Sequence, residues 1–287
     1  MSKNGEALLS RRQRLMGSAY RLFYDEPLHL VRGEDVWLFD RDGRKYLDMY
    51  NNVPHVGHCH PHVVEAICRQ AGTLNTHTRY LHENVLDLAE RLTATFPGDL
   101  DTAMFCCTGS EANELALRIA RTVTGGTGVV VTEFAYHGNS KATFEISTAE
   151  FPATELAEFV VTVPEPDSYR GLYRGENTGS RYANHIREAI ETLAGRGIRP
   201  AAFVIDTISS CSGVVSLPPG YLGEAAKIMR EAGALFIADE VQPGFGRTGK
   251  NFWGFETDDF VPDIVTMGKP MGNGHPLAGV VTRQELT

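Results

Sequence analysis

Several polar residues of this sequence follow short apolar runs, and the first such group is Thr108-Gly109-Ser110. It opens an Ala/Leu-rich segment, so we expect it at the start of a helix. Amide N–H groups and a hydroxyl at a helix start can bind an anion. Ser110 could instead be only the N-cap of this helix, and the residues alone leave both interpretations open.

Asp239 ends the apolar run at 234–238 and is followed by Glu240, Val241 and Gln242. A carboxylate at the end of a buried strand is costly unless it meets a cation. A protonated pyridine nitrogen is such a cation, with Val241 packed on the ring face and Gln242 bonded to the ring hydroxyl. An aspartate bonded to a neighbouring loop explains the same pattern.

Lys269 follows the apolar run at 264–267 and precedes the glycine-rich segment 270–276. A lysine at a strand end can be partly desolvated, which favours its use as a nucleophile. The glycines would let the backbone pass close to a flat ligand. Most lysines are solvated surface charges. Without the pattern of the residues around it, Lys269 would be interpreted as an ordinary surface lysine.

The elements that must position these residues alternate along the chain from about residue 60. This alternation predicts an α/β fold with a mostly parallel central sheet covered by helices. Before it, residues 6–22 predict an amphipathic helix, and residues 36–47 predict a hairpin with its turn at 40–43. Helices are expected at 61–73, 84–95, 110–122, 182–195 and 221–232, and strands at 103–107, 128–132, 201–205, 234–238, 264–267 and 277–281.

Other polar groups follow the same strands, which strengthens the case for a site. Tyr136-His137-Gly138 comes soon after the second expected strand, and Asp206 ends the third. In open α/β sheets the ligand crevice lies outside the carboxyl ends of the strands. Five separate segments therefore deliver polar groups to one edge of the sheet.

Bulk properties exclude several classes of protein. The 287 residues carry a formal net charge of -9, which argues against a nucleic-acid binder. No apolar run approaches the roughly 20 residues that span a bilayer, and the polar, basic N-terminus does not match a secretory signal. The five cysteines, an odd number without CxxC spacing, predict reduced thiols and a cytoplasmic location.

Three further patterns have more than one interpretation. The segment 244–249 matches GxGxxG but does not open a helix, and Asn251 stands where a P-loop needs Ser or Thr. His55, His58, His60 and His62 resemble a metal site, but two prolines break this segment, so a loop at the mouth of the site is favoured and no metal is expected. Arg79 and Tyr80 lie among His77 and His82, and this cluster could recognise an anionic substrate or form a polar interface loop.

The motifs together resemble the class III aminotransferases, pyridoxal-phosphate (PLP) enzymes of fold type I, over nearly the whole chain. The shared segments are GHxHP at 57–61, TGSEAN at 108–113, YHG at 136–138, DEVQPGFGRTG at 239–249 and PDIVTMGKPMGNGHP at 262–276. The resemblance implies that Asp239 and Lys269 are catalytic, Asp239 at the ring nitrogen and Lys269 as the Schiff-base lysine. It implies a cofactor site made of Gly109, Ser110 (phosphate), Tyr136 (ring stacking), His137, Asp206, Asp239, Val241, Gln242 and Lys269.

Within this family the sequence is most similar to phospho-lyases that act on phosphoethanolamine or phosphohydroxylysine. The similar segments are NNVPHVGHCHP, LNTHTRYLHENVLDLAERL and TMGKPMGNGHP, although related ω-aminotransferases share much of them. One hypothesis is β-elimination, in which Lys269 removes a proton beside the amine and phosphate and ammonia are released. A second is transfer of the amino group to a keto acid, and a third is an inactive fragment or binding subunit. Arg79 and Tyr80 are the candidate substrate contacts.

Two departures from the family pattern matter. Asp206 stands where the family often has Glu, which makes the side chain one methylene shorter. Family members also continue well beyond the segment that follows Lys269, through a C-terminal domain. We therefore expect a fragment with an N-terminal segment at 1–55, an incomplete PLP-binding domain at 56–287 and no C-terminal domain. The resemblance implies a homodimer that binds a small-molecule amine, with no membrane or nucleic-acid partner.

Overall fold

The computed structural model describes residues 3–18, 20–50, 53–150 and 156–287. The chain forms two compact units, Met1–Asn75 and Thr76–Thr287. The sequence predicts a domain boundary after residue 55, and that assignment stays a prediction. In the described part of the chain, no helix is long and apolar enough to cross a membrane.

The first unit contains a three-stranded antiparallel sheet and two helices. The predicted hairpin is confirmed, because its two strands pair across a turn in which Asp40 Oδ1 accepts the amides of Asp42 (2.9 Å) and Arg44 (2.8 Å). Such side-chain bonds to the backbone stabilise a turn. The elements are α1 (Lys3–Leu15), β1 (Leu30–Glu34), β2 (Trp37–Asp40), β3 (Lys45–Leu47) and α2 (Pro61–Ala71).

The predicted helix at 6–22 is wrong at its end, because α1 stops at Leu15. Gly17 follows, and glycine is a poor helix former. The chain then bends back, so that Arg12 Nη2 donates to the main-chain oxygen of Tyr20 at 3.1 Å. Residue 19 of the predicted helix lies outside the described residues.

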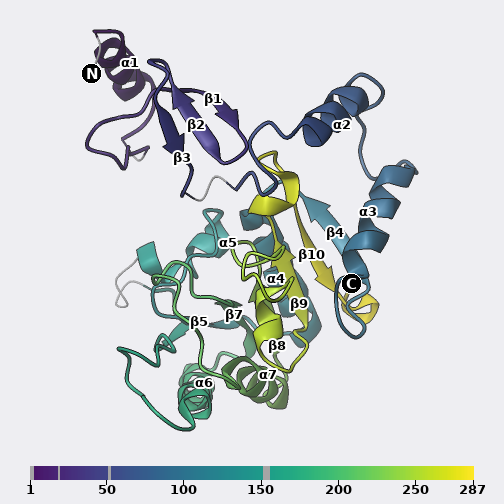
Figure 1. Ribbon diagram of the computed structural model, residues 1–287. Coiled ribbons are helices and arrows are strands. Elements are labelled where there is room, and N and C mark those ends of the chain that lie inside the picture. The colour runs from purple at the N-terminus through teal and green to yellow at the C-terminus, as the bar shows by residue number, and fades with distance from the viewer. Residues whose placement is uncertain (1–2, 19, 51–52, 151–155) are drawn as a thin grey trace. The chain divides into compact units, whose positions relative to one another are not determined.

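The second unit is built on a seven-stranded sheet in the order β4-β10-β9-β8-β7-β5-β6 (Figure 1). The six strands that the sequence predicts here are confirmed within one or two residues, and β6 is an additional edge strand. The strands are β4 (Thr102–Cys106), β5 (Gly128–Thr132), β6 (Val160–Val163), β7 (Pro200–Asp206), β8 (Leu235–Asp239), β9 (Ile264–Met267) and β10 (Ala278–Thr282). The helices are α3 (Glu83–Thr93), α4 (Gly109–Thr124), α5 (Lys141–Phe144), α6 (Thr178–Gly195) and α7 (Tyr221–Glu231), with 3-10 turns η1 (Thr148–Glu150), η3 (Gly254–Thr257), η4 (Lys269–Gly272) and η5 (Gln284–Leu286).

Strand direction brings the polar residues to one edge of this sheet. From β6 to β9 all neighbouring strands pair in parallel. Strand β10 is antiparallel to both β9 and β4, so β4 runs in the same direction as β9. The carboxyl ends of β4, β5, β7, β8 and β9 therefore share one edge, as the mostly parallel prediction requires.

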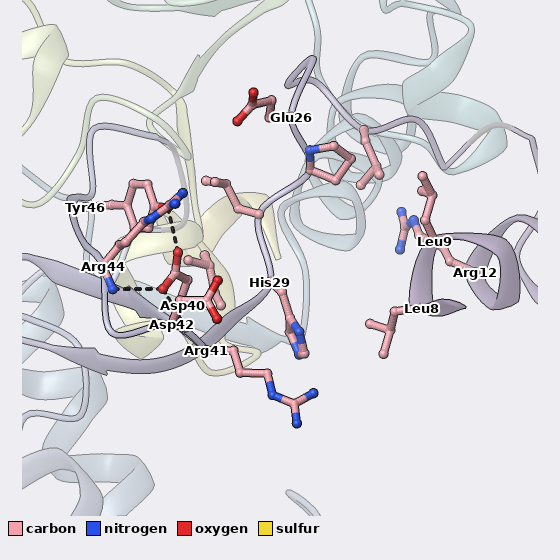
Figure 2. A pocket seen from close by; sticks show the side chains of 14 residues that line it. Leu8, Leu9, Arg12, Glu26, His29, Asp40, Arg41, Asp42, Arg44 and Tyr46 are labelled. Carbon is pink, nitrogen blue, oxygen red and sulfur yellow. Dashed lines mark hydrogen bonds between the residues drawn. The ribbon is translucent and has the colours of Figure 1, made fainter. Parts of the chain in front are cut away.

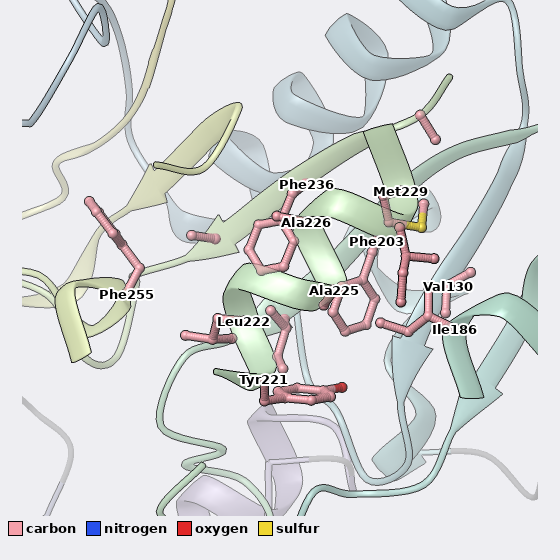
Figure 3. Packing of buried hydrophobic residues seen from close by; sticks show 14 of the residues in the cluster. Val130, Ile186, Phe203, Tyr221, Leu222, Ala225, Ala226, Met229, Phe236 and Phe255 are labelled. Carbon is pink, nitrogen blue, oxygen red and sulfur yellow. The ribbon is translucent and has the colours of Figure 1, made fainter. Parts of the chain in front are cut away.

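Two hydrophobic layers cover the sheet. On one face, α6 and α7 pack against Phe203 and Phe236 (Figure 3). On the other, α4 packs against Val204 and Ile237. Because strand side chains alternate between faces, the pattern that directs Val204 and Ile237 toward α4 also directs Asp206, Asp239 and Thr266 there. The chemistry-bearing residues thus lie on the α4 side of the sheet.

Candidate active site

Asp239 at the end of β8 accepts three hydrogen bonds. Its Oδ2 accepts from His137 Nδ1 (2.7 Å) and Asn113 Nδ2 (2.8 Å), and its Oδ1 accepts from the Val241 amide (3.0 Å). The residue is only 4% exposed. These three donors still leave lone pairs on the carboxylate for a further donor. The neighbouring-loop interpretation is right in part, because His137 belongs to the loop after β5.

The imidazole of His137 contacts Asp239 through one of its two nitrogen atoms. Its Nδ1 faces the carboxylate of Asp239, so Nδ1 carries the proton. Its Nε2 is buried and has no hydrogen-bond partner among the described residues. His137 therefore contacts Asp239 through Nδ1 and orients its carboxylate.

The start of α4 is capped by Thr108 and not by Ser110. Thr108 Oγ1 accepts the amide of Glu111 (3.1 Å), while Glu111 Oε2 accepts the amide of Thr108 (2.9 Å). Ser110 Oγ instead donates to Asn139 Oδ1 (3.0 Å) and accepts the Asn139 amide (3.1 Å). The hydroxyl of Ser110 is therefore not used as the helix cap, and the start of α4 keeps the capacity of a helix N-terminus to bind an anion.

Two glycines permit close approach here. A Cβ on Gly109 would lie 2.9 Å from Val241 Cγ1, which brings the start of α4 against the segment after Asp239. A Cβ on Gly138 would lie 2.6 Å from Ser110 Oγ, and Gly138 also has a φ of +139° that larger residues rarely adopt. Any side chain at either position would displace a neighbouring site residue.

Lys269 begins the 3-10 turn η4 directly after Gly268 at the end of β9. Its φ of +32° lies in the left-handed region, which is strained for a residue with a Cβ. The side chain is exposed, and its Nζ donates to Gln242 Oε1. The turn therefore directs the amine to the segment that carries Val241 and Gln242.

Asp206 lies beside Asp239 in the register of β7 and β8. Its carboxylate folds back on its own loop, where it accepts the amides of Ile208 and Ser210 (both 3.0 Å) and the hydroxyl of Ser210. Burial raises the pKa of Asp206, and the charge of Asp239 raises it further. The shorter side chain is thus held by its own loop, and a cofactor contact at Asp206 stays a prediction.

Glu240 is a buried acid at this edge that sequence reasoning gave no role. It is fully buried, and its carboxylate accepts Thr207 Oγ1 (2.7 Å) and the amides of Gly254 (2.7 Å) and Phe255 (2.8 Å). Burial raises the pKa of Glu240 to about 7, although these donors act in the opposite direction. Glu240 anchors the turn η3 beneath the site.

The raised pKa of Glu240 predicts a pH-dependent stability. Between pH 4.5 and about pH 7 the folded chain keeps a proton on Glu240 that the unfolded chain has lost. The free energy of unfolding should therefore fall across this window as pH rises, by an amount on the order of 3 kcal/mol from this group, and level off above it. Urea unfolding at several pH values checks this, with Glu240→Gln as the variant that cannot titrate. An identical fall in Glu240→Gln would assign it to other groups.

The remaining predicted residues lie in loops of the second unit. Tyr136 precedes His137 in the loop after β5 and is 40% exposed. Arg79 and Tyr80 lie before α3, where the Arg79 amide donates to His77 Nδ1 (3.2 Å) and the His77 and Tyr80 rings are 5.1 Å apart. These loop contacts leave the Tyr80 side chain 65% exposed. Their role as substrate contacts stays a prediction.

The first unit has a hollow of its own between α1, the segment 22–30 and the turn of the β2–β3 hairpin (Figure 2). There Asp40 Oδ2 accepts Tyr46 Oη at 2.8 Å, and Arg12 and Arg44 line the wall. None of the predicted site residues lines this hollow. The histidine segment also belongs to this unit, where His58 Nε2 pairs with Asp48 Oδ2 at 2.7 Å. His58 thus holds the hairpin to the following loop.

Asn113 and Thr266 are buried polar residues that sequence reasoning did not include in the site. Asn113 bonds to Asp239, and Thr266 Oγ1 donates to Asn113 Oδ1 at 2.6 Å. The sequence signal that could have identified them is a polar residue at a position where the apolar pattern predicts a core residue. Asn113 lies on the apolar side of α4, and Thr266 interrupts the apolar run of β9.

Comparisons with known proteins agree with this geometry. The model of the family "Aminotransferase class-III" matches residues 23–287. The alanine–glyoxylate aminotransferase 2-like protein of Drosophila melanogaster is 42% identical over 96% of this chain and 58% of its own length. The ethanolamine-phosphate phospho-lyase homolog 1 of Caenorhabditis elegans is 40% identical over 99% of this chain and 64% of its own length.

A solved phospholyase from Arthrobacter in complex with phosphoethanolamine superposes with a TM-score of 0.91 at 46% identity. The match covers 97% of this chain and 66% of that one. The chain therefore spans about three fifths to two thirds of the length of these proteins. It belongs to the class III aminotransferase family.

Proposed function

We propose that this chain carries the cofactor-binding part of a PLP-dependent lyase that releases phosphate and ammonia from a phosphoethanolamine-like amine. Enzymes of its family are PLP-dependent. The observation that carries the proposal is the convergence of Ser110, Asp239 and Lys269 on the α4 side of one sheet edge. The Arthrobacter phospholyase, which is 46% identical, supports the choice of substrate.

The residues present fit this cofactor. The start of α4, with the hydroxyl of Ser110, is suited to a phosphate group. The close approach at Gly109 leaves Val241 beside the helix start, where an apolar side chain can pack on a flat ring. Asp239 has three donors and can accept a proton-bearing ring nitrogen. Phosphate, ring and ring nitrogen thus each have a residue of the right chemistry.

Bound PLP supplies an electron-withdrawing ring that stabilises the charge formed when a proton leaves the carbon beside the amine. Lys269 Nζ would act as the base that removes this proton, and Gln242 Oε1 lies within hydrogen-bond reach of this amine. Asp239 keeps a proton at the ring nitrogen, and His137 and Asn113 keep Asp239 in position. A phosphate on the adjacent carbon of the substrate then leaves with its bonding electrons.

Amino-group transfer is the alternative function. It is favoured by the Drosophila relative, an alanine–glyoxylate aminotransferase 2-like protein, at 42% identity. Both reactions need the same base at Lys269 and the same carboxylate at Asp239 beside the ring nitrogen. They differ in the substrate and in contacts outside these residues, for which we propose Arg79 and Tyr80.

We also propose that the whole protein works as a homodimer in the cytoplasm. Helix α3 is amphipathic, and the described unit leaves several of its apolar side chains exposed, among them Val85 (42%) and Leu86 (56%). Leu81, just before it, is 98% exposed. Apolar surface of this kind is typical of a protein interface. A second copy of the chain would bury it.

Release of inorganic phosphate tests the proposed function. We expect the PLP-loaded protein to release phosphate and ammonia in equal amounts from O-phosphoethanolamine, and a coupled colorimetric assay follows both. Ethanolamine and O-phosphoserine are controls for the need for a phosphate leaving group and for tolerance of a carboxylate.

No phosphate release, together with a borohydride-reducible adduct at Lys269, would favour the aminotransferase. Pairs of amine donors and keto acids would then be screened for amino transfer. Absence of the reducible adduct itself would contradict both reactions and support an inactive fragment or binding subunit.

A further inference from the structure

A buried chain of hydrogen bonds joins β9, α4 and β8 beneath the candidate site. Thr266 Oγ1 donates to Asn113 Oδ1 (2.6 Å), and Asn113 Nδ2 donates to Asp239 Oδ2 (2.8 Å) and to the main-chain oxygen of His137 (2.8 Å). Thr266 is fully buried and Asn113 is 2% exposed. Because water does not replace a lost partner here, breaking any of these bonds leaves a buried polar group unsatisfied.

The hydroxyl of Thr266 determines which end of the Asn113 amide faces Asp239. A side-chain amide has one acceptor end and one donor end. Since Thr266 donates to Oδ1, the NH₂ group must point to Asp239 Oδ2 and to the His137 carbonyl, both of which are acceptors. The reversed amide would bring its oxygen against these two acceptors.

Asn113 also belongs to the first turns of α4, the helix whose start carries Gly109 and Ser110. One side chain therefore ties the anion-binding end of α4 to the carboxylate at the end of β8. Residues three and four positions apart lie on neighbouring parts of a helix surface. A shift of Asn113 would move Ser110 relative to Asp239.

We propose that Asn113 and Thr266 are positioning residues that set the spacing between the phosphate-binding and ring-nitrogen-binding ends of the cofactor site. This inference rests on the proposed function and deepens it. Thr266 acts only through Asn113, and Asn113 acts through Asp239 and the His137 loop. Neither residue needs to touch the cofactor.

The test compares two threonines of the same sheet. Thr266→Val keeps the shape of the side chain and removes its hydroxyl, and Thr266→Ser keeps the hydroxyl. Thr282→Val is the matched control, because Thr282 is also fully buried in a strand and its Oγ1 donates one bond, to the Asp263 carbonyl at 2.8 Å. Binding of PLP to the apoprotein is followed by quenching of tryptophan fluorescence, and the protonation of the ring by the ¹⁵N chemical shift of labelled PLP.

We expect Thr266→Val to raise the PLP dissociation constant about tenfold and to move the ring nitrogen toward its unprotonated shift. Thr266→Ser should restore both values, and Thr282→Val should lower the melting temperature while leaving both values as in the parent chain. Asn113→Ala, which removes the bonds to Asp239 and His137, should raise the dissociation constant further. If Thr266→Val does not fold, Thr266→Cys keeps the volume with a weak donor and should give intermediate values.

The outcomes separate the two proposals. A parent chain that takes up no PLP contradicts the proposed function. A parent chain that binds PLP, with Thr266→Val and Thr282→Val indistinguishable in dissociation constant and ¹⁵N shift, leaves the function standing and overturns the positioning role.

Discussion

Lys269→Ala should abolish the borohydride-reducible adduct with PLP and lower kcat/KM for the amine substrate by about a thousandfold or more. The side chain is proposed both to hold the cofactor and to remove the substrate proton, and loss of a catalytic acid or base alone typically costs two to four orders of magnitude. Mass spectrometry after borohydride reduction locates the adduct, and the activity assay gives the rate.

Lys227→Ala is the matched control for this experiment. Lys227 is an exposed lysine on α7, which packs on the opposite face of the sheet from α4. Its removal should leave both the adduct and the rate as in the parent chain. An adduct that persists in Lys269→Ala would mean that another lysine holds the cofactor.

Asp239→Asn should lower activity by about 100- to 1000-fold, the loss expected when one preorganised charge at a reacting centre is removed. The neutral amide would no longer favour a protonated ring nitrogen. Its NH₂ group would also face the donors of His137 and Asn113, so the fold should lose on the order of 1–3 kcal/mol of stability. Steady-state kinetics and urea unfolding measure the two effects separately.

Asp263→Asn separates stability from chemistry in this comparison. Asp263 is 1% exposed and accepts the Phe236 amide (2.8 Å) while it pairs with Arg230 and Arg283 (both 3.1 Å). Its variant should be destabilised at least as much as Asp239→Asn but should keep the absorption spectrum of bound PLP. Equal spectral changes in both variants would reduce Asp239 to a structural residue.

The elements of the second unit were predictable from sequence because their apolar runs are short, regular and bounded by turn residues. Helix α4 is an example, with a cap at Thr108 and a left-handed glycine, Gly125, at its end. Strand β6 was missed, since its run Val160–Val163 is brief, lies at the sheet edge and carries none of the site residues. The end of α1 was predicted too late, because the helix-breaking effect of Gly17 was given too little weight against the apolar pattern that continues after it.

The sequence predicted which segments reach the site but not the contacts between their side chains. Sheet topology explains why Asp239 and Lys269 were found, because each follows a strand that ends at the same edge. The roles of Asn113 and Thr266 depend on a contact between residues 153 positions apart, which neither local pattern contains. The capping role at Ser110 could not be settled either, since Thr108 is an equally good cap by type and only the geometry distinguishes them.

The position of β10 between β4 and β9 has a consequence for how the chain acquires its site during synthesis. Strand β4 precedes α4 and emerges early from the ribosome, but its partner Ala278–Thr282 is made only after Lys269. Until those residues are made, the described sheet offers β4 no neighbouring strand. The turn η4, which begins at Lys269, and the start of α4 at Gly109 are then not yet held in one sheet. Pairing between such distant segments is slow and exposes unpaired strand edges. The sheet therefore reaches its final strand order only when β10, the last strand in sequence, inserts between β4 and β9.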